Sequence, residues 1–365
     1  MISITVNGVD TLYSSIDANY PASAIKIDCD IKDAGTADIT IPPNSLALAF
    51  GNYDYRKPYR DIVEIKRDEE LLFRGRLISK RRDVWMNARF TCEGELAMFK
   101  DGVIRADTYT GAPSALFGTV VSAYNEQVDT FKRFSVGTVT VTTTESSPCL
   151  ELEKAVSTAE ALAKLREKYG GYITFRTAAG TRYIDWLASL SAVSDQMIEF
   201  GSNLLDVAIT KANSDYANRI IPFGKKVNDE YVKLSGRPDY VEDQTAQASY
   251  GIVAKAVYFS DVEDPATLLI RANAELAERS RIIDTITVSA LDLKELANIP
   301  QIGLATTDGL DVGLTVRVKS APHGIDALYP ITHRTYDLLN PKNGKITLGG
   351  SIVNLTSVLA GNGGI

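Results

Sequence analysis

The sequence is poor in the residues that most catalytic and metal centres use. Its 365 residues include three cysteines, two histidines and two tryptophans. Cys29, Cys92 and Cys149 lie far apart and form no Cys-x-x-Cys pair, which argues against a disulfide framework and a cysteine-bound zinc ion. Cys29 and Cys92 fall within strand patterns, so we expect both to be core thiols.

The two histidines do not form a recognisable metal site either. His323 lies in a predicted turn and His333 in the middle of a predicted strand, with no third ligand at a suitable spacing. The sequence also lacks glycine-rich phosphate loops, HExxH and GxSxG. Two acidic pairs fit solvated strand faces and turns: Asp28 with Asp30, and Glu69 with Glu70. We therefore expect no catalytic, cofactor-binding or metal-binding residues, no cofactor and no enzymatic activity.

Long apolar runs and an excess of basic residues are missing as well. No run approaches the ~18 residues of a membrane span, and the start MISITVNGVD has no basic or apolar signal region. The formal net charge of −7 disfavours general nucleic-acid binding. We expect no membrane span, no specific nucleic-acid binding and synthesis in a reducing cytoplasm.

Alternating residues from Asp61 to Gly94 predict three antiparallel strands. In the first strand Val63 and Ile65 are expected on the face opposite Ile62, and in the second strand Leu71, Phe73 and Leu77 are expected to share one face. Arg74 and Arg76 then lie on the opposite face. Gly75, inside the second strand, indicates a bulge or a barrel bend. With Trp85–Cys92 as the third strand, the segment is typical of a small barrel.

A similar pattern returns between Gly313 and Gly350. Arg317 and Lys319 alternate with apolar residues in a first strand, and Leu328–Asp337 forms the second. A turn with Pro, Asn and Gly precedes a third strand at Lys345–Leu348. Sequence identity between the two segments is low, so duplication of one barrel and two generic meanders both explain the pattern.

Three helices are predicted between these segments. Ala112–Val128 is the first, Ser157 caps the second with a glutamate three residues later, and Asp264 caps the third at Pro265–Ser280. Residues 225–247 are polar and predicted to be loop. Other strands are predicted at Met1–Val6, Ala24–Ile31, Thr36–Ile41, Phe134–Thr143, Tyr172–Arg176, Thr181–Trp186 and Ile282–Leu291.

This order predicts a β-rich α+β protein with a second barrel split by an insertion. The expected parts are a first β-barrel at 1–97, the first part of an α+β domain at 98–199, the first part of a second β-barrel at 200–245, the second part of the α+β domain at 246–300, the second part of the second barrel at 301–353 and a flexible tail at 354–365.

Several short phrases occur in an order that matches one known family. They are Phe90–Leu96, Tyr124–Val128, Lys132–Val141, Tyr250–Gly251, Pro265–Leu269, Val288–Leu293, Pro322–Asp326, Asp337–Pro341 and Thr347–Gly349. Together, from Val84 to Gly350, they resemble the prophage endopeptidase tail family. The chain ends soon after the second predicted barrel, so we expect the family's peptidase part to be absent.

This resemblance implies a baseplate-hub-like fold with two β-barrel tube domains and α+β peripheral domains. It implies a homotrimeric structural hub at the distal tip of a phage or prophage tail, which passes DNA. The implied partners are the distal tail ring or tail tube protein, the tape measure protein and a tip spike or fibre. Three copies with two barrels each would present a pseudo-sixfold ring. The implied location is the virion tail tip, after assembly in the bacterial cytoplasm.

Four basic residues of the two barrels are candidates for facing the lumen of such a ring: Arg74, Arg76, Arg317 and Lys319. An acidic chain with scattered basic residues would allow weak, sliding contact with DNA. The alternative is that these residues solvate the sheet or pair with acids across subunits.

Two other functions remain open from the sequence. Tyr53, Tyr55 and Tyr59 could stack on sugars in a receptor- or carbohydrate-binding adhesin. A tyrosine-rich loop packed on a neighbouring subunit explains the same residues. The second alternative is a peptidoglycan hydrolase.

Overall fold

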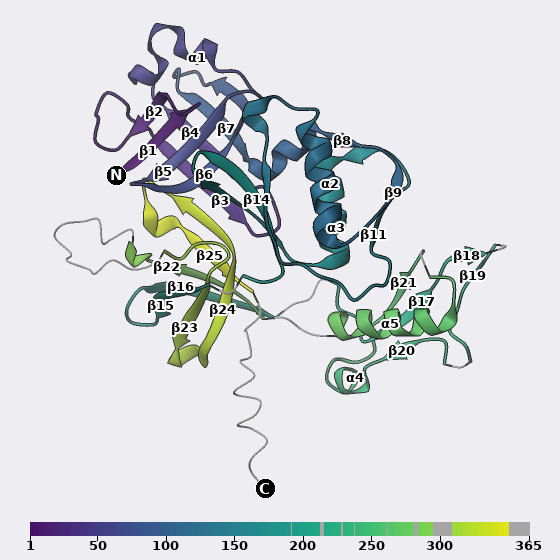
Figure 1. Ribbon diagram of the computed structural model, residues 1–365. Coiled ribbons are helices and arrows are strands. Elements are labelled where there is room, and N and C mark those ends of the chain that lie inside the picture. Colours follow the sequence, from purple (N-terminus) through teal and green to yellow (C-terminus); the bar gives the residue numbers. More distant parts are fainter. Residues whose placement is uncertain are drawn as a thin grey trace. The chain divides into compact units, whose positions relative to one another are not determined.

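The computed structural model describes most of the chain (Figure 1). The described residues are 1–190, 192–211, 215–227, 229–236, 238–260, 262–280, 284–294 and 309–349. They divide into two compact units, one built from residues 1–207 and 288–348 and the other mainly from 208–287. The tail predicted at 354–365 lies outside the described residues.

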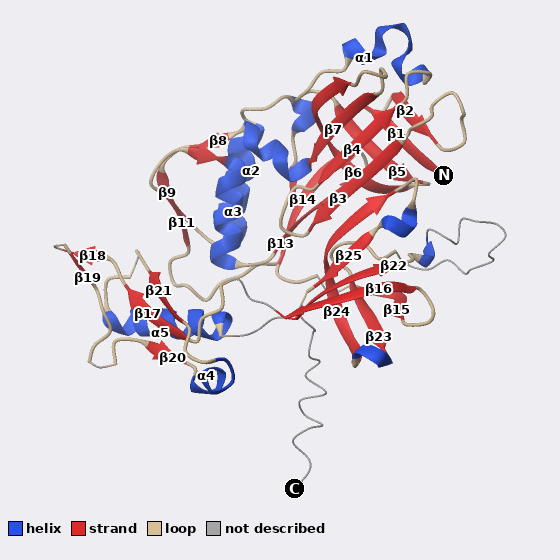
Figure 2. Cartoon of the chain, turned by 180° about the vertical axis from the view of Figure 1, so that it is seen from behind, coloured by secondary structure: helices blue, strands red, loops and turns tan. Residues whose placement is uncertain are grey.

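A curled 13-stranded sheet dominates the first unit, so the prediction of a β-rich α+β fold is confirmed (Figure 2). Its strands are β1 (Ile2–Val6), β2 (Asp10–Ser14), β3 (Ala24–Asp30), β4 (Thr36–Ile41), β5 (Ile62–Arg67), β6 (Glu70–Arg82), β7 (Ala88–Gly94), β15 (Val193–Glu199), β16 (Leu204–Lys211), β22 (Asp284–Ala290), β23 (Thr315–Ser320), β24 (Ile325–Asp337) and β25 (Lys345–Leu348). Short helices in this unit are η1 (Leu46–Gly51), α1 (Asn52–Tyr55), η4 (Ala321–His323) and η5 (Pro341–Asn343).

The first meander, β5–β6–β7, is antiparallel as predicted. Phe73 and Leu77 of β6 are buried in the apolar core that β1–β7 enclose. The prediction that Leu71 shares their face is wrong, because a bulge at Ile65/Lys66 shifts the register and pairs Leu71 with Lys66.

The third strand of this meander begins later than predicted. Trp85 lies in the turn before β7, which starts at Ala88. The apolar run from Val84 to Met86 resembles a strand in composition, but the Asp83 carboxylate accepts hydrogen bonds from the backbone N–H groups of Trp85 and Asn87. Those bonds close a turn instead.

The second meander, β23–β24–β25, repeats the antiparallel pairing of the first. Its first two strands have 6 and 13 residues, as in β5 and β6, and all three are antiparallel. The predicted echo of the meander is therefore confirmed. β24 also pairs with β3, so the two meanders belong to one continuous sheet.

Residues 95–187 form an α+β part beside the first meander. Its elements are η2 (Glu95–Asp101), β8 (Val103–Ile104), β9 (Asp107–Thr110), α2 (Pro113–Asn125), η3 (Thr130–Lys132), β10 (Ser135–Val139), β11 (Cys149–Leu152), β12 (Val156–Ser157), α3 (Thr158–Tyr169), β13 (Tyr172–Ala178) and β14 (Thr181–Leu187). The Ser157 hydroxyl accepts from the N–H of Glu160, which confirms the predicted cap. The core here is aromatic, with Phe117 stacked on Trp186 at 5.4 Å between ring centroids.

The second unit is a small α/β structure. It contains β17 (Arg219–Phe223), β18 (Lys226–Val227), β19 (Glu230–Tyr231), β20 (Val241–Glu242), α4 (Gln244–Tyr250), β21 (Ala254–Tyr258) and α5 (Pro265–Arg279). The Asp264 side chain caps α5 as predicted, by accepting from the N–H groups of Ala266 and Thr267. The prediction that 225–247 is all loop is wrong, because three short strands and the start of α4 lie there. These strands are too short for an alternating pattern to reveal them.

Candidate functional site

Arg74 occupies a buried ion-pair network between the first meander and the α+β part. Its guanidinium contacts Glu64 at 3.2 Å and Glu95 at 2.5 Å. The Glu95 carboxylate, itself 5% exposed, also binds the guanidinium of Arg182 on β14. Because Glu95 lies between two buried cations, it neutralises charge where water has little access.

Arg76 lies in a parallel network two residues further along β6. Its guanidinium binds Asp101 at 2.5 Å and Glu93 at 3.4 Å, and donates to the carbonyl of Ala97 at 3.2 Å. Lys132 Nζ contacts the other oxygen of Asp101 at 2.9 Å. Arg76 therefore links β6 to Ala97 and Asp101 of η2, and Lys132 of η3 contacts the same Asp101 carboxylate.

Burial and charge change the pKa values in this cluster. Burial, reinforced by the positive charge of Arg74, lowers the pKa of Arg182 to about 10. Burial would raise the pKa of Asp101, but hydrogen bonds from Arg76 and Lys132 outweigh it and hold that pKa below its ordinary value. Asp101 thus stays ionised at neutral pH and supports the network.

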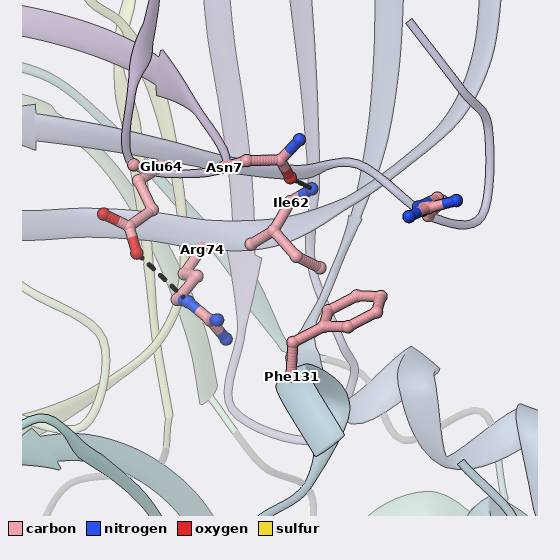
Figure 3. A pocket seen from close by; sticks show the side chains of 7 residues that line it. Asn7, Ile62, Glu64, Arg74 and Phe131 are labelled. Atoms are coloured by element: carbon pink, nitrogen blue, oxygen red, sulfur yellow. Dashed lines mark hydrogen bonds and ion pairs between the residues drawn. The ribbon is translucent and has the colours of Figure 1, made fainter. Parts of the chain in front are cut away.

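A cavity of about 360 Å³ opens beside Arg74 (Figure 3). Ile62 and Phe131 give it an apolar wall, and the dashed contact between Glu64 and Arg74 borders it. The Asn7 side chain closes one edge by accepting from the N–H of Ile62 at 2.9 Å. The three labelled polar side chains of this cavity, Asn7, Glu64 and Arg74, all make hydrogen bonds within the chain, and Arg60 adds a further cation to the lining.

Arg317 and Lys319 have a different environment in the second meander. Arg317 pairs with Asp326 at 2.9 Å, and Lys319 pairs with Glu199 at 3.3 Å. The side chains of Arg317 and Lys319 are 58% and 50% exposed. The sequence placed the four basic residues in one class, whereas the structure covers Arg74 and Arg76 and exposes Arg317 and Lys319. A place in a lumen stays a prediction.

A second buried polar cluster, centred on Asp292, was missed by the sequence reasoning. The Asp292 carboxylate accepts from Arg334 at 2.9 Å, from Gln196 Nε2 at 3.0 Å and from the N–H of Leu310 at 3.0 Å. Burial would raise its pKa, but the charge of Arg334 and these hydrogen bonds lower it instead. The only sequence signal was an aspartate inside the apolar phrase Val288–Leu293.

Two of the three tyrosines considered for sugar binding are exposed. Tyr55 and Tyr59 reach solvent, while Tyr53 packs on Phe90 with 5.9 Å between ring centroids. The Arg82 guanidinium lies 4.2 Å from the centre of the Tyr53 ring. Tyr53 is therefore engaged on its face, and Tyr59 also has a cation over its ring, because the Arg76 guanidinium carbon lies 5.4 Å from the ring centre.

The remaining candidates fit structural roles. His333 lies on a sheet face with Nε2 2.9 Å from Asp28, and His323 Nδ1 lies 2.7 Å from the Ser320 hydroxyl. Cys92 is buried as predicted, whereas Cys29 is only partly buried. Among the described residues no group of three or more His, Cys, Asp or Glu side chains could hold a metal ion. No helix in the described ranges is long and apolar enough to cross a membrane.

Comparison with known families gives a match for the second half of the chain. Residues 193–359 match the model of the prophage endopeptidase tail family. The predicted family resemblance is confirmed. The phrases between Phe90 and Val141 lie outside the matched residues, so they remain a resemblance drawn from the sequence. No curated protein matches the chain.

Solved structures of phage tail proteins share the fold over nearly the whole chain. A 43 kDa tail protein of prophage MuSo2 from Shewanella oneidensis is 13% identical with a TM-score of 0.61, covering 96% of this chain and 98% of that one. A tail protein from Neisseria meningitidis MC58 is 15% identical with a TM-score of 0.63, covering 96% of each chain. Prophage tail protein gp18 from Listeria monocytogenes EGD-e is 12% identical with a TM-score of 0.57, covering 98% and 97%.

The family match and the shared fold together support a structural role in a phage tail. The family's name includes an endopeptidase, whereas the three solved structures are of tail proteins. Association with other tail components follows from such a role.

Proposed function

We propose that this chain is a structural hub at the distal tip of a phage or prophage tail. In this proposal three copies form a ring that joins the tail tube or distal tail ring to tip components and surrounds the path of the DNA. The tape measure protein and a tip spike or fibre are further proposed partners. The chain assembles in the bacterial cytoplasm and acts in the virion.

The observation that carries this proposal is the repeated meander. β5–β6–β7 and β23–β24–β25 share antiparallel pairing, their first two strands have the same lengths, and β24 joins β3 in one sheet. A chain with two similar meanders allows a threefold ring to offer six similar surfaces, which suits a sixfold tail tube. The division into two barrels and α+β peripheral domains is part of the proposal.

Oligomeric mass tests the ring directly. Light scattering of the purified chain should give three times the chain mass of 39.7 kDa, either alone or after mixing with tail tube protein. A stable dimer, or a monomer that stays monomeric with the tube protein, would contradict the hub.

Within this hub the proposed lumen contacts now rest mainly on Arg317 and Lys319. These side chains are exposed, and the acids with which they pair are themselves 49% and 37% exposed, so both cations remain available for weak contact with phosphate groups. Arg74 and Arg76 have little surface to offer, because Glu95 and Asp101 engage them within the chain.

A tail-tip adhesin is the second candidate function, and the exposed rings of Tyr55 and Tyr59 favour it. Binding of the purified chain on a glycan array, lost in a Tyr55→Ala/Tyr59→Ala variant, would support it. The third candidate, a peptidoglycan hydrolase, predicts a clear zone in a zymogram of the purified chain. We expect no clearing.

A further inference from the structure

The turn between β6 and β7 exposes three apolar side chains in succession. Val84, Trp85 and Met86 are 85%, 77% and 50% exposed. The other tryptophan of the chain, Trp186, is fully buried and donates its Nε1–H to the carbonyl of Gly170 at 3.0 Å. Scattered surface apolar residues are common, but a contiguous group that includes tryptophan marks a contact surface.

Hydrogen bonds hold this turn in one shape. The Asp83 carboxylate accepts from the N–H groups of Trp85 and Asn87, each at 2.9 Å, and from Asn87 Nδ2 at 2.9 Å. The Asp83 N–H donates to the carbonyl of Asn87, and the Met86 N–H donates to that of Asp83. Met86 has a φ of 64°, a left-handed conformation that is unfavourable for a residue other than glycine. A turn fixed in this way loses little conformational entropy when it binds.

The base of the same hairpin is basic. Lys80 Nζ donates to the carbonyls of Tyr53 and Asp54, and Arg82 lies over the Tyr53 ring, so both side chains are held in place. Arg81 beside them is exposed. Lys80, Arg81 and Arg82 outnumber the single carboxylate of Asp83 in residues 80–87, so this hairpin end is net positive in a chain with a net charge of −7. A complementary surface therefore needs an apolar pocket with carboxylates around it.

We propose that the β6–β7 turn is a docking anchor that inserts Trp85 into an apolar pocket rimmed by carboxylates on another protein of the tail. This inference rests on the proposed function, because it takes the partner to be a tail component. Tryptophan, tyrosine and arginine dominate the binding energy of protein interfaces more often than other residues do. The turn offers a rigid Trp85, with Arg81 and Arg82 at its base.

The Asp83 carboxylate makes a protein pocket a better fit than a lipid bilayer. Hydrogen bonds from Asn87 and Trp85 lower the pKa of Asp83, so this group stays ionised at neutral pH. Insertion deeper than the three apolar side chains would bring that charge into hydrocarbon, which is costly. A shallow pocket accepts the tip and leaves Asp83 at its edge.

The test compares variants in a lysogen that encodes this chain. Trp85→Ala removes the anchor, Arg81→Glu reverses a charge at the base, and Ile16→Ala is the matched control because Ile16 is 76% exposed on another loop. Tails are purified on a density gradient after induction, and the chain is quantified in them by immunoblot. Trp85→Ala should lower the bound amount by at least about tenfold. Arg81→Glu should lower it less, and Arg81→Lys and Ile16→Ala should not change it.

Light scattering and vesicle binding separate the possible causes. The Trp85→Ala variant should keep the oligomeric mass of the wild type, and wild type should not bind vesicles of phosphatidylglycerol and phosphatidylethanolamine. A lost oligomer would assign the turn to contacts between copies, and vesicle binding that depends on Trp85 would assign it to a membrane; either result overturns the proposal. If the Trp85→Ala variant is incorporated into tails as well as wild type, the docking anchor is overturned and the proposed function is not. Wild-type chain missing from tails overturns it together with the proposed function.

Discussion

The two meanders have the same strand pattern and give their cations opposite environments. The side chain of Arg76 in the first is 4% exposed, whereas that of Arg317 in the second is 58% exposed. In both, strand alternation turns the cation away from the apolar face of its own strand. The difference arises from η2 and β14, which supply Glu95, Asp101 and Arg182 to the first meander. The same alternation of apolar and basic residues therefore gives buried ion pairs in the first meander and exposed ion pairs in the second.

The largest expected effect comes from removing Glu95. Glu95→Ala leaves Arg74 and Arg182 buried without this carboxylate, which should cost about 3–5 kcal/mol of unfolding free energy. The melting temperature should fall by roughly 10 °C. The equivalent change beside the second meander is Glu199→Ala on β15, which should cost less than about 1 kcal/mol because the pair of Glu199 with Lys319 is exposed. Equal losses of unfolding free energy in Glu95→Ala and Glu199→Ala would show that the buried and the exposed ion pairs contribute equally to stability.

Acid should weaken the packing of β24 through Asp292, the buried anion that pairs with Arg334. The folded state lowers the pKa of Asp292, so its contribution to stability is complete above the unfolded pKa and is lost as pH falls through the folded value. Urea midpoints of wild type should therefore decrease below about pH 4. Asp292→Asn should lower the midpoint at pH 7 and flatten its decrease in acid. If the urea midpoint of Asp292→Asn decreased in acid as steeply as that of wild type, the ion pair of Asp292 with Arg334 would not cause the acid sensitivity.

Gly75 lies where β6 pairs with both β5 and β7, and a substitution there tests how closely these strands must approach. An added Cβ would come within 2.1 Å of the carbonyl oxygen of Glu93, a backbone atom that cannot easily move. Gly75→Ala should therefore destabilise the protein by about 1–3 kcal/mol in urea unfolding. The control is Gly118→Ala in α2, where the added Cβ meets nothing within 4 Å and should stabilise the helix by up to about 1 kcal/mol. A neutral Gly75→Ala would show that the strands can separate there.

The smallest effect on stability is expected at the exposed cations. Arg317→Glu with Lys319→Glu should leave the melting temperature and the oligomeric mass nearly unchanged, because these pairs face solvent. If they contact DNA in a lumen, ejection of DNA from phage carrying the double variant should be slower. Normal ejection kinetics would confine the two residues to surface ion pairs.

Sequence patterns identified the meanders, the helix caps and the faces of most strands, because each depends on neighbours along the chain. The alternation in β6 predicted that Phe73 and Leu77 face the apolar core and that Arg74 lies on the opposite face of the strand, and the structure shows the same arrangement. The Asp264 and Ser157 caps were equally local. The one face assigned wrongly, that of Leu71, failed at a bulge, where a single extra residue reverses the alternation.

The candidate site needed contacts between residues that are distant in sequence. Glu95 and Arg182 meet across 87 residues, and Gln196 meets Asp292 across 96, so no spacing rule could pair them. Trp85 shows the same limit at short range, because its apolar neighbours suggested a strand until the Asp83 hydrogen bonds closed the turn.

By itself the sequence determined which side chains of the two meanders turn away from the core, since alternation follows from backbone geometry alone. It also determined the family resemblance, which the match over residues 193–359 confirmed. The tertiary structure decided which of those outward faces is covered. Coverage depends on where η2 and β14 pack, and packing between distant segments is fixed by shape and charge in three dimensions rather than by order along the chain.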